Sequence, residues 1–147
     1  MTASAMKWLV LAVLSISVVA SADDKAQCSY LEISATNGST PAFDPDLQQV
    51  EKKLHMPPLN AWNTFHKLSG GPFPLEKQKA ESLKLAQGAA SILLRDRTDK
   101  RLELTVSVDG ADGKRVLDNK QNVNVGDWVM FGHNVKNDGH ILAVTCR

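Results

Sequence analysis

Residues 101–108, RLELTVSV, alternate strictly between polar and apolar side chains. Successive side chains of a strand point to opposite faces, so one face would carry only Leu102, Leu104, Val106 and Val108. This alternation is typical of an antiparallel sheet that buries one face in a core and leaves the other in water. The stretch therefore predicts a half-buried strand and, with it, a β-rich fold.

Strand-like segments separated by turn sequences lie on both sides of this stretch. We expect further strands at 28–36, 62–68, 82–85, 91–94, 114–125, 128–131 and 141–144. The last two are apolar on both faces, which predicts central, buried strands, and Asn137-Asp138-Gly139 is a strong hairpin sequence between them. Gly70-Gly71-Pro72 is expected to end the strand at 62–68.

One segment, 45–55, predicts a helix. Asp44 is a favourable N-cap, Pro45 suits the first helical position, and Pro57-Pro58 prevents continuation. Its apolar stripe would consist of Leu47, Val50 and Leu54. We therefore predict a mainly β fold with a minor α part: an antiparallel β-sandwich or open barrel of about eight strands with one short helix.

Residues 1–22 have the three parts of a cleavable signal peptide. Lys7 supplies the positive charge, residues 8–20 form an apolar run broken only by two serines, and Ala20-Ser21-Ala22 is a small-x-small cleavage sequence. This run is too short for a membrane-spanning helix, which needs about 20 apolar residues. We expect cleavage between Ala22 and Asp23, a single β-rich domain at 23–147, and export to the periplasm, the outer membrane or the extracellular space.

The charge of the mature domain excludes two classes of partner. The chain has 17 Lys and Arg against 16 Asp and Glu, and loss of Lys7 leaves 16 of each. A neutral domain without a basic stripe lacks the electrostatic footprint of a nucleic-acid-binding protein and the polybasic cluster of a membrane-binding one. We therefore expect no nucleic-acid partner and no membrane insertion of the mature domain.

The two cysteines, Cys28 and Cys146, lie near opposite ends of the mature domain, each in a strand-like run. An even number of cysteines in an exported chain favours a disulfide. We predict a bond between them, which would make the first and last strands close neighbours; two unpaired buried thiols are the alternative.

The sequence holds no established catalytic or metal-binding motif. Of the four histidines, His133 and His140 flank the predicted hairpin turn and could face each other there, with Asp138 nearby, as a site for a divalent metal ion. Two exposed hairpin histidines are the favoured interpretation. We therefore assign no catalytic, cofactor-binding or metal-binding residue and expect no cofactor.

The aromatic residues have two possible roles. They could form a shelf on which a ligand stacks, or they could belong to the core, which is favoured in a domain with so few aromatics. The residues concerned are Trp62, Phe65, Trp128 and Phe131.

The order of these features resembles an uncharacterised family of small exported bacterial β-rich proteins. The resemblance is carried by Asp44-Pro45-Asp46-Leu47, Leu54, 62–69, Leu83, 123–131 and 141–144. Residues 125–132 are also faintly similar to a hairpin of secretins, although His133 replaces the second glycine of that motif. The resemblance implies a location in the cell envelope and no particular activity.

We interpret the chain as an exported, non-enzymatic protein-binding or accessory module whose partner is another envelope or extracellular protein. The polar stretch 114–124 is the candidate binding edge, with Lys114, Arg115 and Asn122 as its residues, because it has few apolar side chains to bury. Two alternatives stay open: a small secreted hydrolase or metal-dependent enzyme, and a β-sandwich that binds carbohydrate or another small ligand.

Overall fold

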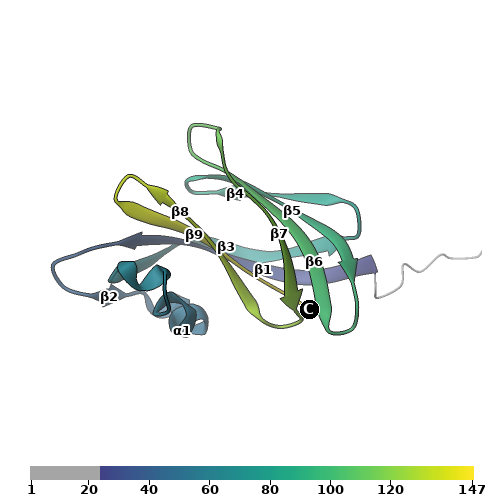
Figure 1. Ribbon diagram of the computed structural model, residues 1–147, viewed down its shortest axis with the longest axis horizontal. Coiled ribbons are helices and arrows are strands. Elements are labelled where there is room, and N and C mark those ends of the chain that lie inside the picture. The colour runs from purple at the N-terminus through teal and green to yellow at the C-terminus, as the bar shows by residue number, and fades with distance from the viewer. Residues whose placement is uncertain (1–23) are drawn as a thin grey trace, which may run out of the picture.

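The computed structural model describes residues 24–147, so the predicted signal peptide and its cleavage site at Ala22 and Asp23 lie outside the described residues. Two β-sheets pack face to face (Figure 1). One has the strand order β2-β3-β1-β9-β8 and the other β4-β5-β6-β7. The strands are β1 (Lys25–Thr36), β2 (Ala42–Phe43), β3 (Thr64–Glu76), β4 (Ala80–Leu85), β5 (Gly88–Arg97), β6 (Arg101–Asp109), β7 (Arg115–Asn124), β8 (Trp128–Val135) and β9 (Asp138–Cys146).

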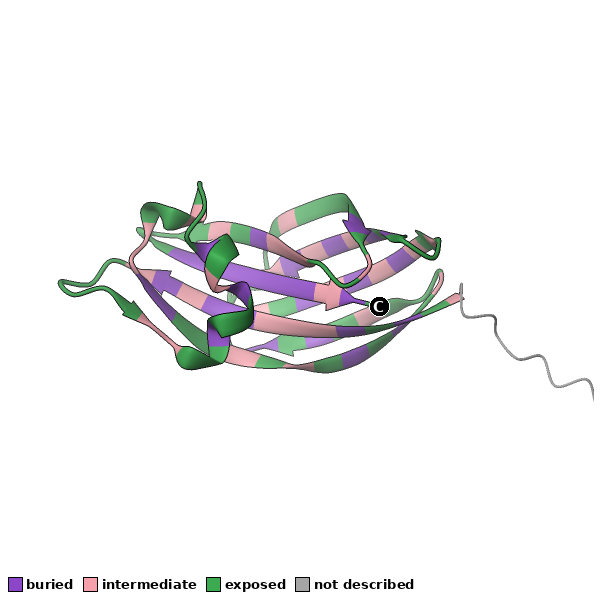
Figure 2. Ribbon diagram, turned by 90° about the horizontal axis from the view of Figure 1, so that it is seen from below, coloured by how far each residue is buried: buried purple, intermediate pink, exposed green. Residues whose placement is uncertain are grey.

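The arrangement confirms the predicted mainly β sandwich. Neighbouring strands are antiparallel, apart from the two-residue β2, which runs parallel to β3. The sheets do not close into a barrel. The strand at 101–108 is β6, and its four apolar side chains are buried in the core between the sheets. Figure 2 shows the alternation of buried and exposed residues along the strands.

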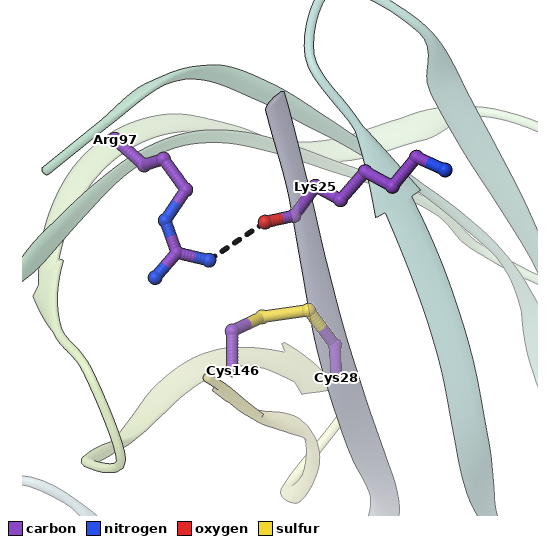
Figure 3. The surroundings of a disulfide bond; sticks show 4 residues. All are labelled: Lys25, Cys28, Arg97 and Cys146. Atoms are coloured by element: carbon purple, nitrogen blue, oxygen red, sulfur yellow. Dashed lines mark hydrogen bonds between the residues drawn. A yellow bond between two sulfur atoms is a disulfide. The ribbon is translucent and has the colours of Figure 1, made fainter. Parts of the chain in front are cut away.

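The first and last strands are neighbours and are linked by the predicted disulfide. Cys28 of β1 lies opposite Cys146 of β9, with Cα atoms 4.0 Å apart and sulfurs 2.08 Å apart. Both cysteines are buried in the main core. Beside them, Arg97 Nη1 of β5 donates a hydrogen bond to the Lys25 carbonyl of β1 at 2.6 Å, which joins the two sheets at this end of the sandwich (Figure 3).

A second, smaller core lies on the outer face of the five-stranded sheet. It is covered by the 3₁₀ helix η2 (Pro45–Val50) and the single-turn helix α1 (Glu51–Leu54), where the helix at 45–55 was predicted. Asp44 caps η2 by accepting a hydrogen bond from Asp46 N at 2.9 Å, as predicted. Residues three apart eclipse in a 3₁₀ helix, so Leu47 and Val50 both face the sheet.

The predicted turn at Gly70-Gly71-Pro72 is wrong, because β3 runs through it to Glu76. A Cβ on Gly70 would lie 2.8 Å from the Tyr30 carbonyl oxygen, so this glycine permits the close approach of β1 rather than a turn.

The prediction that 128–131 is a central strand is also wrong, whereas 141–144 is central as expected. β8 forms the edge of the five-stranded sheet, so Trp128 and Met130 are only half-buried and Phe131 alone of the predicted segment is buried. The predicted hairpin exists, but its turn is Lys136-Asn137, one residue earlier than expected. Gly139 instead lies in β9, where a Cβ would come within 2.8 Å of the Trp62 ring.

Candidate functional site

The most unusual group in the described structure is the carboxylate of Glu32 on β1, which lies between the two sheets and is fully buried. Oε1 accepts hydrogen bonds from Ser69 Oγ at 2.6 Å and Ala86 N at 2.7 Å. Oε2 accepts one from Gln87 N at 3.0 Å and contacts His140 Nε2 at 2.7 Å. Ala86 and Gln87 form the β4–β5 turn, so Glu32 joins the sheets at the end opposite Arg97.

This environment keeps Glu32 ionised. Burial by itself would raise the pKa of Glu32, but the hydrogen bonds that the carboxylate accepts, led by the one from His140, outweigh burial and lower its pKa to about 2. Because the carboxylate has no proton to donate, Nε2 of His140 carries the proton in their contact. A buried ionised group with this many donors is an organising element of the sandwich.

The two hairpin histidines face each other, and the expectation that both are exposed is wrong, because His140 is buried and His133 is half-buried. His133 on β8 and His140 on β9 are register partners with ring centroids 4.9 Å apart. His140 is buried at 2% exposure because its ring lies on the inter-sheet face, next to Glu32. Burial, together with the nearby His140, lowers the pKa of His133.

These residues do not form a hydrolase triad. The hydroxyl of Ser69 donates to Glu32 and not to a histidine, so the residues do not have the serine–histidine–acid order of a triad. Within residues 24–147, no group of three or more His, Cys, Asp or Glu side chains is arranged to hold a metal ion, and Asp138 does not complete a site with His133 and His140.

The predicted binding edge lies where it was expected in the sheet. β7 is the outer strand of the four-stranded sheet. Val125, just after β7, donates its N–H to the Lys100 carbonyl at 2.9 Å, so its backbone groups face the β6 side. In an antiparallel pair the direction of the backbone groups alternates along the strand. Counting back from Val125, the N–H and C=O of residues 124, 122, 120 and 118 therefore point away from β6. We call the outward groups of Asp118, Lys120 and Asn122 the β7 edge.

The other two predicted residues have structural roles at the start of β7. Lys114 lies in the turn before β7 rather than in the strand, and its N–H donates to Asp112 Oδ1 at 3.0 Å. Arg115 pairs through Nε with Asp109 Oδ1 at 2.7 Å, which fastens β7 to β6. Asn122 is thus the member of the predicted set that belongs to the edge.

The four aromatics divide between core and surface. Phe65 and Phe131 are buried, as favoured, whereas Trp62 and Trp128 are half-exposed. Trp62 donates from Nε1 to the Asn137 carbonyl at 3.1 Å and lines a groove of about 480 Å³ beside β8. Trp128 lines a smaller pocket of about 260 Å³ on the outer face of the five-stranded sheet.

Sequence reasoning overlooked Glu32 and Ser69. The sequence does contain a signal for Glu32. Cys28, Tyr30 and Glu32 are spaced two residues apart, so their side chains are expected on the same face of the strand. Nothing local marks Ser69, because its partner lies 37 residues away along the chain.

No family model, curated protein or solved structure matches this chain. None of the helices within residues 24–147 has the length and apolar character needed to cross a membrane.

Proposed function

We propose that this protein is an exported protein-binding module that captures an extended segment of another envelope or extracellular protein by strand addition to the β7 edge. In strand addition, backbone hydrogen bonds supply affinity and side-chain contacts supply specificity. The disulfide supports the export part of this proposal, because such bonds persist in oxidising compartments.

The observation that carries the proposal is the contrast between two sheet edges. Gln27 of β1 exchanges both backbone hydrogen bonds with Arg147, so its backbone groups point away from β3. Pro74 lies opposite Gln27, and Pro72 lies two residues earlier on β3. The nitrogens of both prolines therefore point away from β1, toward the open side of β3. Proline has no N–H to offer there, so that edge is closed to pairing. The β7 edge keeps its donors, while the charges of Asp118 and Lys120 oppose pairing with a second copy.

The test uses two variants at one position. Asn122→Pro removes an outward N–H, whereas Asn122→Ala removes the side chain and keeps that N–H. Mature protein carrying a photo-crosslinker beside β7 would identify the partner in the native envelope, and the purified partner would then be titrated against each variant. We expect Asn122→Ala to bind as the wild type does and Asn122→Pro to lose binding with an unchanged melting temperature. Equal binding by a well-folded Asn122→Pro variant would rule out the β7 edge.

One observation favours a second candidate function, saccharide binding at the Trp128 pocket. Four polar side chains line this pocket and make no hydrogen bond within the described residues: those of Gln27, Ser29, Gln49 and Thr145. A half-exposed indole beside free amides and hydroxyls suits an uncharged, hydroxyl-rich ring. Screening on a glycan array would test it: a glycan bound by the wild type should be lost with Trp128→Ala and kept with Trp62→Ala.

A further inference from the structure

The edge of β8 lacks the devices that usually protect a sheet edge. Proteins guard exposed edges with charged residues, prolines or covering segments. The β3 edge has its two prolines, and β4 carries Glu81 and Lys84. β7 carries Arg115, Asp118 and Lys120, whose charges oppose pairing with a second copy and leave its backbone donors open to another partner. β8, with the sequence WVMFGHNV, contains no proline and no Asp, Glu, Lys or Arg. An unguarded edge indicates a place that a partner strand can occupy.

Among residues 24–147, none pairs through its backbone with the outer side of β8. The hairpin turn is Lys136-Asn137, so Val135 and Asp138 are the hydrogen-bonded pair that closes it. Counting back along β8 from Val135, every second residue directs its backbone N–H and C=O toward β9. The groups of the residues between them point away from the sheet. We call these outward groups, on Met130, Gly132 and Asn134, the β8 edge.

Gly132 is a strand glycine that the fold does not require. A Cβ there would lie 3.5 Å from Leu59 Cδ2 and 3.7 Å from Ile141 Cγ1, which are ordinary van der Waals distances, and its φ is not in the left-handed region. Gly70 and Gly139, in contrast, would clash with neighbours at 2.8 Å. A glycine weakens a strand, so its use at this position calls for another reason. Its missing side chain leaves room in the groove beside β8.

That groove has a volume of about 480 Å³, and we call it the β8 groove. Met130 and Gly132 of β8 form one side of it, and Met56, Leu59 and Trp62 contribute apolar surface from the segment that follows α1. Met56 is 55% exposed, an unusual state for a large apolar side chain. Exposed methionines adapt to the shape of an apolar partner.

We propose that the β8 edge and the β8 groove together bind an extended peptide segment of another protein, with a bulky apolar side chain of that segment seated over Gly132. The segment would add as a strand to β8, and every second side chain would then face the groove. This site is separate from the β7 edge and does not depend on it.

The charge of the groove indicates a further property of the segment. Lys53 is the one lining residue with a full charge, no carboxylate lines the groove, and Lys53 makes no salt bridge within the described residues. A carboxylate on the segment, close to its apolar anchor, would complement Lys53. The partner is therefore an extended, alternating segment with a Leu, Met or Phe anchor and a nearby Asp or Glu.

The experiment begins with a displayed library of random short peptides selected against the mature protein, and uses the best peptide as the probe. We expect selected sequences to share an apolar anchor, alternation and an acidic residue. Methylation of the probe's backbone nitrogens one at a time should weaken binding at every second position, because only alternate N–H groups face β8. Selected peptides without alternation, or binding that no methylation weakens, would overturn strand addition here.

Two variants test the groove itself. Gly132→Val should weaken probe binding about tenfold or more, since its side chain occupies the anchor's place, while Gly132→Ala should weaken it less. Met56→Ser removes an exposed wall residue without touching the core and should also weaken binding. Melting temperatures close to that of the wild type serve as the folding control. Unchanged affinity in the Gly132→Val and Met56→Ser variants would overturn the proposal.

Two further outcomes would also overturn it. The proposal is wrong if sedimentation shows a dimer that Gly132→Val dissociates, because the occupant is then a second copy of this chain. It is also wrong if Asn122→Pro abolishes probe binding while Gly132→Val does not, because the probe then sits on the β7 edge. Probe binding that survives Asn122→Pro and fails with Gly132→Val supports the proposal whatever happens to the β7 partner.

Discussion

At the scale of single residues, Glu32 is the group on which the two sheets converge. One oxygen accepts hydrogen bonds from Ser69 of its own sheet and Ala86 of the other, and the second oxygen lies between Gln87 and His140. Removing one member of a buried charged network leaves its partners without hydrogen bonds, which costs more than the net value of the network. Glu32 should therefore be among the residues most sensitive to substitution.

We predict that Glu32→Ala lowers the free energy of unfolding by about 3–5 kcal/mol, because several buried donors lose their acceptor at about 1–3 kcal/mol each. The turn N–H groups of Ala86 and Gln87 and the ring of His140 would all lose their acceptor. Urea unfolding followed by circular dichroism measures the change. Glu103→Ala, at an exposed carboxylate, is the control and should change stability by less than about 0.5 kcal/mol. A similarly small effect at Glu32 would contradict this role of the carboxylate.

The same carboxylate makes stability depend on pH. The pKa of Glu32 falls from 4.5 to about 2 in the folded protein, so the unfolded state binds more protons as the pH falls. Its contribution, about 3 kcal/mol, is complete above pH 4.5 and is lost as the pH falls toward 2. The lowered pKa of His133 acts in the same direction below its ordinary value of 6.5. Unfolding free energies measured across this range should fall steeply for the wild type and much less below pH 4.5 for Glu32→Gln. The fall that remains in the variant comes from carboxylates such as Asp44 and Asp96, whose pKa values are also lowered by the hydrogen bonds that they accept.

At the scale of elements, the burial of a strand follows its place in the sheet rather than its composition. β8 and β9 are both apolar, yet β9 is buried on both faces between β1 and β8, while β8 has a neighbour on one side only. The aromatic side chains of β8 divide accordingly. Phe131 faces the inter-sheet core at 3% exposure, and Trp128 faces outward.

We therefore predict unequal costs for two substitutions on this strand. Phe131→Ala should lower the free energy of unfolding by about 3–5 kcal/mol, as for other buried aromatics. Trp128→Ala should cost clearly less, because its side chain keeps contact with water in the folded protein. Denaturant unfolding of both variants gives the comparison. A larger loss for Trp128→Ala than for Phe131→Ala would mean that the outer face is better packed than the structure shows.

At the scale of the whole molecule, the sandwich is closed at its two ends by unlike devices. The disulfide and the Arg97–Lys25 hydrogen bond lie at one end, and the Glu32 network lies at the other. Between them the sheets are joined by apolar packing. The two edges proposed as binding sites, β7 and β8, belong to different sheets, so the two proposed partners would pair with separate strands.

We predict that the double variant Cys28→Ser, Cys146→Ser folds with a melting temperature lower by more than about 10 °C. The bond joins residues 118 apart, for which the chain-entropy model gives about 4–5 kcal/mol. Calorimetry with and without reductant measures the shift, and the wild type should show the same shift on reduction. Protein from the oxidising compartment should show no free thiol when labelled in denaturant. Two labelled thiols there would contradict the structure.

The sequence by itself determined the local features of this protein. The alternation of 101–108, the cap at Asp44 and the bond between the two cysteines depend on neighbouring residues or on residue type, and all three are present. The tertiary structure alone decided which strands are edges, because edge and centre differ only in what lies beside a strand. It also decided the burial of Glu32 and His140, which a polar side chain tolerates only when residues distant in the chain supply hydrogen bonds. Open edges and a groove are likewise relations between elements, so the binding sites proposed at β7 and β8 depend on how the sheets are ordered.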